Sequence, residues 1–462
     1  MDWILSILIA FTGVALALVR STWAVDFVVF VFVFNRGLRR IVDYYVNGGL
    51  TLLSPISLTP LVVTAALLIP AILRIQEIPR RSSSVLSPLL GAIAYAFIIG
   101  FLHSKIAAIY AVAEVLSPLA LFAYVLLLRP STAVKDRWVR SFAWAAILAS
   151  AYGWFQYMTI PPWDGAWLIQ SGMYGYMGIP EPTRMTVFST MAERGPLASF
   201  LGFSVVPMVV AKRWRPLPGV LGWAAVILVF SVILLSMSRA GVIIAVVGCV
   251  SYVLINRGKG FGQLAIAVVV LALAGAFLVK RMPNTERVTK RFESLQNMEE
   301  DGSLQGRIMI MSYGPERLLA EPQGTGLGGS GQATRINTGT LATEATVVDA
   351  GWFNVFLVFG LPGSLLIIAA MVLLWKSLAE RFRMPQTLDE HVYLARAFFI
   401  TVIIASLAGS VLMNFSIIWL AFGCGLGIAR DFRVNARQGY RPGPMLPGPA
   451  PLRTNPGHRP AG

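Results

Sequence analysis

Long apolar segments, separated by short polar connectors, follow one another along most of the chain. They cover residues 3–19, 22–34, 51–73, 86–102, 106–128, 138–158, 197–211, 218–235, 240–256, 262–279, 350–375, 396–411 and 414–429. A helix needs about 20 mainly apolar residues to cross a bilayer, and most of these segments approach that length. The pattern predicts an all-α polytopic membrane protein with about 12–13 transmembrane helices.

Two polar loops interrupt this pattern and define the domains. The first region, 1–279, consists of transmembrane helices and carries the shorter loop, 159–196. A large loop at 280–349 follows, then C-terminal transmembrane helices at 350–429 and a basic tail at 430–462. The Pro and Gly content of the tail predicts disorder. Because the large loop is the main soluble part of an otherwise apolar chain, we expect it to work on a water-borne substrate.

The distribution of charge predicts which loops face the cytoplasm. The tail holds six Arg against one Asp, whereas loop 280–349 holds eight Lys or Arg against nine acids. Loop 159–196 holds two Arg against three acids. Basic connectors stay inside, so the tail is predicted to be cytoplasmic and both loops periplasmic.

The N-terminal third breaks this rule. Counting back places residues 35–50 outside, together with Arg36, Arg39 and Arg40. Either one of the short segments 3–19 and 22–34 does not span, or these arginines face outward for a reason.

Composition narrows the functional classes. The chain is 56% hydrophobic and 13% charged, against about 25% charged in soluble domains. The net charge of +16 gathers in the connectors and tail, which indicates topology rather than nucleic-acid binding. Both cysteines lie in apolar segments and the three histidines are scattered, so no disulfide, metal site or cofactor is indicated.

Arg239 is the strongest candidate for a substrate-binding residue. It lies in Ser238-Arg239-Ala240-Gly241, at the predicted outer end of the span 240–256. One interpretation is an interfacial arginine beside a serine helix cap. However, an arginine at a helix N-terminus is unfavourable by about 0.3–1 kcal/mol unless an anion is bound there. We therefore predict an anion site that faces a cavity shared with loop 280–349, with Arg307 and Arg184 in reach.

Further candidates lie in the two loops. Trp163, Asp164, Arg184 and Arg194 belong to the shorter loop, whose aromatic residues fit either an interfacial belt or stacking on sugar rings. Arg307 and Arg335 belong to the larger loop, as does the run from Gly324 to Gly331. That run lacks the Lys-Ser/Thr of a phosphate-binding loop, which favours a flexible turn.

Two acids inside predicted spans also stand out. Asp26 and Glu114 lie within or beside apolar segments. Ionisable groups inside a membrane are costly and are functional candidates by default. Because both lie in the N-terminal half, their position relative to the loops depends on the topology of that half.

The order of these motifs resembles the O-antigen ligase and Wzy-type polymerase superfamily of bacterial inner-membrane glycosyltransferases. The resemblance covers about residues 150–430 and rests on Ser238 to Gly241, on Gly306-Arg307, on the glycine run, and on Asp349 followed by Gly360-Leu361-Pro362-Gly363. It implies a glycosyltransferase C-type (GT-C-like) fold acting on lipid diphosphate-linked glycans at the periplasmic face. It also implies arginines on the diphosphate and no metal.

One departure bears on which activity the resemblance implies. The ligase branch has a His-Asn pair eleven residues before the position of Gly360, where this chain has Asp349-Ala350 and no histidine in its predicted outer loops. This favours a polymerase that joins undecaprenyl or other polyprenyl diphosphate-linked repeat units into O-antigen or exopolysaccharide. Its catalytic residues would be Asp349, Arg239 and Arg307, with Asp349 as base or only as a helix cap.

Other interpretations remain open. The alternative within the class is an O-antigen ligase that transfers glycan to lipid A core. A transporter or flippase would need ionisable groups and broken helices near the midplane, whereas charge here gathers in two loops on one face. The expected partners are the lipid-linked substrate, the membrane and a chain-length-regulating co-polymerase, in the bacterial inner membrane.

Overall fold

The computed structural model describes most of the helical part of the chain. The described residues are 2–51, 54–258, 260–270, 308, 312–316, 318–329, 333, 351–384, 389–407, 409, 412 and 415–428, without the side chains of Arg80 and Arg81. Arg307, Arg335 and Asp349, predicted to be functional, lie outside these residues, as does most of the predicted loop 280–349.

The described chain is α-helical, which confirms the predicted fold class. Its elements are α1 Asp2–Leu18, α2 Trp23–Tyr45, η1 Pro55–Leu58, α3 Thr59–Leu73, η2 Ile75–Glu77, α4 Arg80–Ser104, α5 Ile106–Leu128, α6 Thr132–Thr159, α7 Pro162–Gln170, α8 Tyr174–Met177, η3 Ser189–Met191, α9 Arg194–Val210, η4 Lys212–Trp214, α10 Gly219–Leu235, α11 Arg239–Ile255, α16 Gly351–Phe382, α17 Glu390–Ala405 and α18 Ser416–Leu426. Every predicted apolar segment overlaps one of them, or the helix Phe261–Val270, within the described residues.

By length and composition, four helical segments could cross a membrane on their own. They are Pro55–Leu73, Ser82–Ser104, Ile106–Leu128 and Gly351–Phe382, and shorter apolar helices accompany them. Within the described residues the only β-type pairing is one isolated bridge between Gly178 and Met185. The chain is therefore an all-α multi-pass membrane protein.

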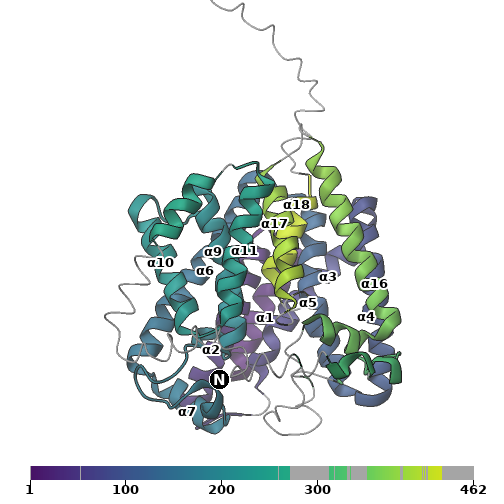
Figure 1. The fold of residues 1–462 in the computed structure, drawn as a ribbon. Helices are drawn as coiled ribbons and strands as arrows, with labels where there is room; N and C mark the ends of the chain where they lie inside the picture. Colours follow the sequence, from purple (N-terminus) through teal and green to yellow (C-terminus); the bar gives the residue numbers. More distant parts are fainter. Residues whose placement is uncertain are drawn as a thin grey trace, which may run out of the picture.

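The long helices run between two faces of the bundle (Figure 1). We call the side that carries α7, η3 and residues 321–329 the loop face. The opposite side, with η4 and the end of α18, is the tail face. Figure 1 places α7 and the N-terminus together at the loop face, at the lower end of the view. The charge pattern predicts the loop face to be periplasmic.

Both N-terminal helices pass between the two faces. Asn47, just beyond α2, donates to the Asp2 carboxylate at the start of α1 over 3.0 Å. At the other end, the indole nitrogen of Trp138 donates to the carbonyl of Thr22, which precedes α2. Arg36, Arg39 and Arg40 therefore lie toward the loop face, and the reason must be sought in their contacts.

Small residues allow α9 and α11 to pack closely. A Cβ on Gly241 would lie 2.6 Å from the carbonyl oxygen of Ala198, and one on Gly202 would lie 2.6 Å from that of Gly241. Further along, a Cβ on Gly248 would lie 2.5 Å from a methyl group of Val206. Glycine at helix interfaces lets backbones approach, as in membrane helix pairs generally. Because the two helices run parallel, both begin at the loop face.

Candidate functional site

Two arginines lie at the loop-face ends of α9 and α11. Arg194 is the first residue of α9 and Arg239 the first of α11. Each is within about one helical turn of the contact between Ala198 and Gly241, so the two side chains start from neighbouring positions. Both are partly exposed. This parallel pairing places two helix N-termini and two guanidinium groups on one part of the surface, which suits an anion.

The serine cap expected as the alternative at α11 is not formed. Ser238 holds the N-cap position, but its side chain makes no capping hydrogen bond. Ser236 instead donates to the carbonyl of Ile233 over 2.6 Å. The Ser236 hydroxyl also accepts from the backbone N–H of Ser238, the N-cap residue of α11, over 3.4 Å.

The arginines of α2 add positive charge beside this region. Arg36 donates to the carbonyl of Met191 over 3.2 Å, and Arg40 donates to the carbonyl of Ser189. Both acceptors belong to η3, which precedes α9 by two residues. The spacing of four residues puts the two arginines on one face of α2. Arg36 and Arg40 thus have a structural role at this end of α2, because they bind the shorter loop. Arg39 instead pairs with Asp43 and donates to the carbonyl of Thr51.

Asp164 is the buried counterion of Arg40. The Asp164 carboxylate accepts from the Arg40 Nε over 2.6 Å, from the Tyr152 hydroxyl over 2.7 Å and from the Gln156 amide over 2.6 Å. Arg40 is 2% exposed and Asp164 1% exposed. Trp163 donates from its indole nitrogen to the Tyr152 hydroxyl over 2.7 Å. This network joins α2, α6 and α7, and the predicted role of Asp164 and Trp163 in substrate binding stays a prediction.

The remaining shorter-loop candidates lie nearer the surface. Arg184 forms a 2.6 Å ion pair with Glu181, and the two side chains are 54% and 51% exposed. The Arg194 guanidinium stacks on the ring of Tyr176 at 3.9 Å. Arg194 is thus brought to the region of Arg239. Whether Arg184 reaches the same region stays a prediction.

The glycine run forms a tight turn wedged between helices. The backbone N–H groups of Thr325 and Gly326 donate to the carbonyls of Leu357 and Val358 in α16, and that of Leu327 donates to Ala96 in α4. Gly324, Gly326 and Gly328 have φ of +78°, +75° and +86°, which glycine adopts without strain. The turn was expected, and hydrogen bonds attach it to two helices, so the N–H groups of Thr325, Gly326 and Leu327 are already used inside the protein. The flexibility of the turn stays a prediction.

The partner of this turn is a kink in α16. Gly360 has φ +61° and ψ −173° inside the helix, followed by Pro362. A Cβ at Gly360 would overlap the backbone of Gln323. The Leu361 N–H donates to the carbonyl of Pro322 over 2.8 Å. The segment just before the glycine run therefore packs against the kink at Gly360-Leu361-Pro362-Gly363.

One histidine lies at the loop-face end of a helix, outside the two long loops. His103 lies in the last turn of α4, next to Lys105, which connects α4 to α5. It is exposed, and its Nδ1 lies 2.8 Å from the carbonyl oxygen of Ile99 in the same helix. A histidine near a helix C-terminus can stabilise the helix through the helix dipole. This position therefore has an explanation without a functional role.

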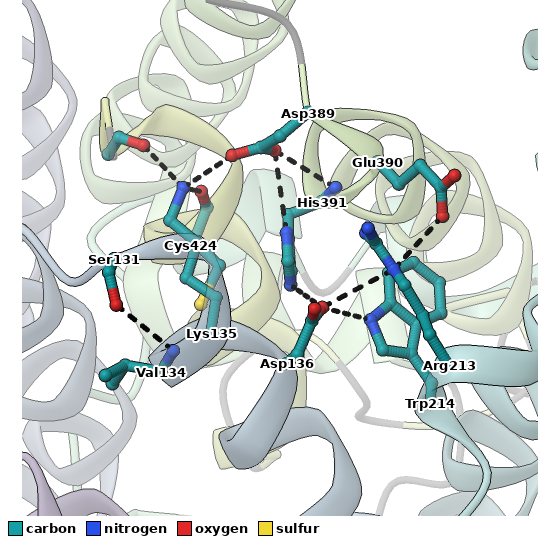
Figure 2. Close-up of polar contacts among 11 residues, drawn as sticks. Ser131, Val134, Lys135, Asp136, Arg213, Trp214, Asp389, Glu390, His391 and Cys424 are labelled. Carbon is teal, nitrogen blue, oxygen red and sulfur yellow. Dashed lines mark hydrogen bonds and ion pairs between the residues drawn. The ribbon is translucent and has the colours of Figure 1, made fainter. Parts of the chain in front are cut away.

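A second polar cluster lies on the tail face and stabilises the bundle. Figure 2 shows Lys135 of α6 between Asp389 and the end of α18. The Lys135 ammonium donates to the Asp389 carboxylate over 2.8 Å, and to the carbonyls of Cys424 and Gly427 over 2.8 and 2.7 Å. Lys135 is fully buried. A cation on the last carbonyls of a helix is favourable, so this lysine closes α18.

His391 extends this cluster towards η4. Its Nε2 lies 3.2 Å from the Asp136 carboxylate, which also accepts from the Trp214 indole nitrogen over 2.8 Å (Figure 2). Burial opposes ionisation of Asp389, but the hydrogen bond from His391 and the charge of Lys135 hold the pKa of this carboxyl below its ordinary value. Burial also opposes ionisation of Asp136, but the hydrogen bonds from His391 and Trp214 and the charge of Arg213 lower the pKa of this carboxyl. Lys135 pairs with Asp389, and Asp136 accepts from Trp214, so these buried groups connect α6, η4 and the start of α17.

The described residues hold no group of three or more potential metal ligands. Arg194 and Arg239 on the loop face combine two guanidinium groups with two helix N-termini. This arrangement can bind an anion and stabilise a leaving group that gains negative charge.

Comparison with protein families identifies the segment that contains Arg239. Residues 224–368 match the family model Wzy_C, O-antigen ligase. This segment is similar to the O-antigen ligase domain. The resemblance to the O-antigen ligase and Wzy-type superfamily is thereby confirmed. The Wzy_C family covers ligases and polymerases, so the chain is related to enzymes that transfer glycans. No curated protein matches the chain.

The Wzy_C domain contains only part of the candidate site. Arg239, Arg307, Arg335, Asp349, the glycine run and its receiving kink fall within residues 224–368. Trp163, Asp164, Arg184 and Arg194 fall outside, as do the arginines of α2. The sequence missed Arg36 and Arg40 as parts of this region. The available signal was their spacing of four residues and their conflict with the positive-inside rule.

Proposed function

We propose that this protein is a polymerase that joins polyprenyl diphosphate-linked oligosaccharide repeat units into O-antigen or exopolysaccharide. The reaction takes place at the periplasmic face of the bacterial inner membrane on a GT-C-like fold, without a metal ion. The observation that carries the proposal is the arrangement of Arg194 and Arg239 at the starts of two closely packed parallel helices, with Arg239 inside the Wzy_C domain.

The arginines account for donor binding and activation. The planar fork of a guanidinium binds two oxygens of a diphosphate at once, and helix N–H groups reinforce it. A hydroxyl of the incoming repeat unit attacks the anomeric carbon of the growing chain. The bond from that carbon to the diphosphate oxygen breaks, and polyprenyl diphosphate leaves with the electron pair. Arg239 and Arg307 would stabilise the charge that develops on this leaving group.

Asp349 is proposed as the base that takes the hydroxyl proton. A carboxylate with a pKa of about 3.9 is ionised at neutral pH and can accept it. Asp349 lies two residues before Gly351, the first residue of α16, so helix capping is the competing explanation. Asp349→Asn separates the two, because asparagine still caps a helix but cannot act as a carboxylate base.

The choice of polymerase over ligase rests on the sequence before α16. Asp349-Ala350 stands where the ligase branch has His-Asn, and the family match supports both activities equally. A ligase needs a lipid A core acceptor, whereas a polymerase uses a second lipid-linked repeat unit. A co-polymerase that sets chain length would be a partner of the polymerase only.

The decisive experiment uses purified protein in detergent with lipid-linked repeat units as the only glycan. We expect a ladder of longer lipid-linked glycans, lost in Arg239→Lys because a point charge does not replace bidentate geometry. Arg257→Lys, just beyond the tail-face end of the same helix, is the matched control and should retain the ladder. Asp349→Asn should leave single repeat units while the protein accumulates normally. A ligase would instead form no ladder, and would transfer the glycan to lipid A core when this acceptor is added.

A further inference from the structure

Arg396 is a cation inside α17, at the point where the predicted apolar segment 396–411 begins. It lies six residues after Glu390, the first residue of the helix, or about 9 Å along the helix from the tail-face end. Residues 397–405, which follow it in α17, carry no charge. An arginine at this depth is costly unless its side chain is paired or reaches the membrane surface.

Two aromatic rings of α16 enclose the Arg396 guanidinium. Its central carbon lies 4.6 Å from the ring centroid of Trp375 and 4.6 Å from that of Phe382. Because Trp375 and Phe382 are seven residues apart, they lie on one side of α16 at a distance of about 10 Å along its axis. The guanidinium therefore lies between the two rings. These contacts stabilise its charge, but the rings carry no oxygen that could accept from its N–H groups.

The N–H groups of Arg396 have no acceptor within the described residues. Its Nε is buried and makes no hydrogen bond there, and no carboxylate of the described chain pairs with the side chain. The two acids at the start of α17 are already used, since Asp389 pairs with Lys135 over 2.8 Å and Glu390 pairs with Arg213 over 3.2 Å. The charge of Arg396 therefore needs an acceptor that the described helices do not supply.

This part of the bundle surface is open to lipid. Arg396, Trp375 and Phe382 are each partly exposed. Val372, one turn before Trp375 on α16, is 46% exposed, as expected for contact with acyl chains. Lys376, the residue after Trp375, is also exposed and adds positive charge. An arginine about 9 Å from a helix end can extend its charged group to the headgroups of the nearer leaflet, where tryptophan is also common.

We propose that Arg396, Trp375 and Phe382 bind the phosphate group of an anionic phospholipid in the leaflet at the tail face. The planar guanidinium binds two phosphate oxygens at once, and the two rings hold it in place. Basic pockets between transmembrane helices bind phospholipid headgroups on the cytoplasmic side, which is where the charge pattern predicts the tail face to lie. The site is on the opposite face from Arg194 and Arg239 and does not depend on the proposed polymerase function.

The test measures lipid binding to the purified full-length protein in a nonionic detergent by native mass spectrometry. The probe is phosphatidylglycerol, and phosphatidylcholine, whose own cation balances its phosphate, is the comparison lipid. Wild-type protein should bind phosphatidylglycerol more tightly. Loss of the charge-assisted hydrogen bonds in Arg396→Gln should raise the Kd for phosphatidylglycerol about ten- to hundred-fold. Arg396→Lys keeps the charge without the planar fork, so its Kd should lie between the two.

Arg383→Gln is the matched control. Arg383 is exposed and directly follows Phe382, so this change removes one positive charge from the same end of α16. It leaves the guanidinium between the two rings in place. The Kd of Arg383→Gln for phosphatidylglycerol should therefore stay close to that of wild type.

Three results would overturn the proposal. In the first, wild-type protein binds phosphatidylglycerol and phosphatidylcholine with equal Kd. In the second, Arg383→Gln weakens binding as much as Arg396→Gln does, so that the lipid responds only to the overall charge of the surface. In the third, an excess of inorganic phosphate displaces the lipid from wild-type protein, so that the site takes a free phosphate ion. The first and third results need no variant, so they decide the matter even if Arg396→Gln does not fold.

Discussion

Asp164→Asn should destabilise the protein far more than a change at an exposed carboxylate. The variant removes the only acidic partner that Arg40 has within the described residues, and Arg40 is 2% exposed. Breaking a buried ion pair from one side leaves an uncompensated charge and typically costs about 3–5 kcal/mol. Tyr152 and Gln156 also lose the carboxylate that they both donate to. We expect a loss of at least about 3 kcal/mol in the free energy of unfolding.

The assay is unfolding of the purified protein in mixed micelles with increasing SDS, followed by circular dichroism. Glu181→Gln is the matched control, because its partner Arg184 is 54% exposed and such pairs contribute about 0–1 kcal/mol. A double variant with Arg40→Met should cost less than the sum of the two single changes, since it removes both charges. If Asp164→Asn is as stable as Glu181→Gln and yet loses glycan binding, Asp164 is a substrate ligand and the reasoning from burial is wrong.

Two further predictions concern the glycine turn and the tail-face cluster. Gly326→Ala places a Cβ against the backbone of α4 at φ +75°, so it should cost more than the roughly 1–2 kcal/mol of a left-handed residue, whereas Gly175→Ala should be neutral in the same SDS titration. Burial opposes ionisation of Asp389, but His391 and Lys135 lower the pKa of this carboxyl in the folded protein. As pH falls, the unfolded state therefore takes up a proton at this residue before the folded state does. Stability should therefore be complete above about pH 4 and decline below it, and Asp389→Asn should flatten this decline in melting temperatures measured from pH 6 to pH 3.

The sequence predicts the helices well because a bilayer demands long apolar segments. Even the weakest candidates, 3–19 and 22–34, form α1 and α2. It predicts less about where helices bend. Gly360 and Pro362 indicate a kink in the sequence. The structure adds that residues 322–327 form hydrogen bonds with the backbone of α16 at this kink.

The candidate site is only partly readable from the sequence, since its contacts join distant segments. Arg239 could be singled out from its place at a helix start. Arg36 meets Met191 across 155 residues, and no local pattern encodes that contact. Asp164 carries the same sequence signature whether it binds sugar or Arg40. The burial of Asp164 distinguishes these two roles, and that burial depends on how distant helices pack together.

The bond between Arg40 and Asp164 also sets an order of events during synthesis. The two residues are separated by 124 positions, which at about 5–20 residues per second corresponds to a delay of about 6–25 s. On the predicted topology, Arg40 faces outward without its counterion until Asp164 has crossed the membrane, against the preference of the insertion machinery. We expect α1 and α2 to reach their final orientation only after α6 and α7 have been made. Truncation between these helices should therefore yield N-terminal fragments of mixed topology.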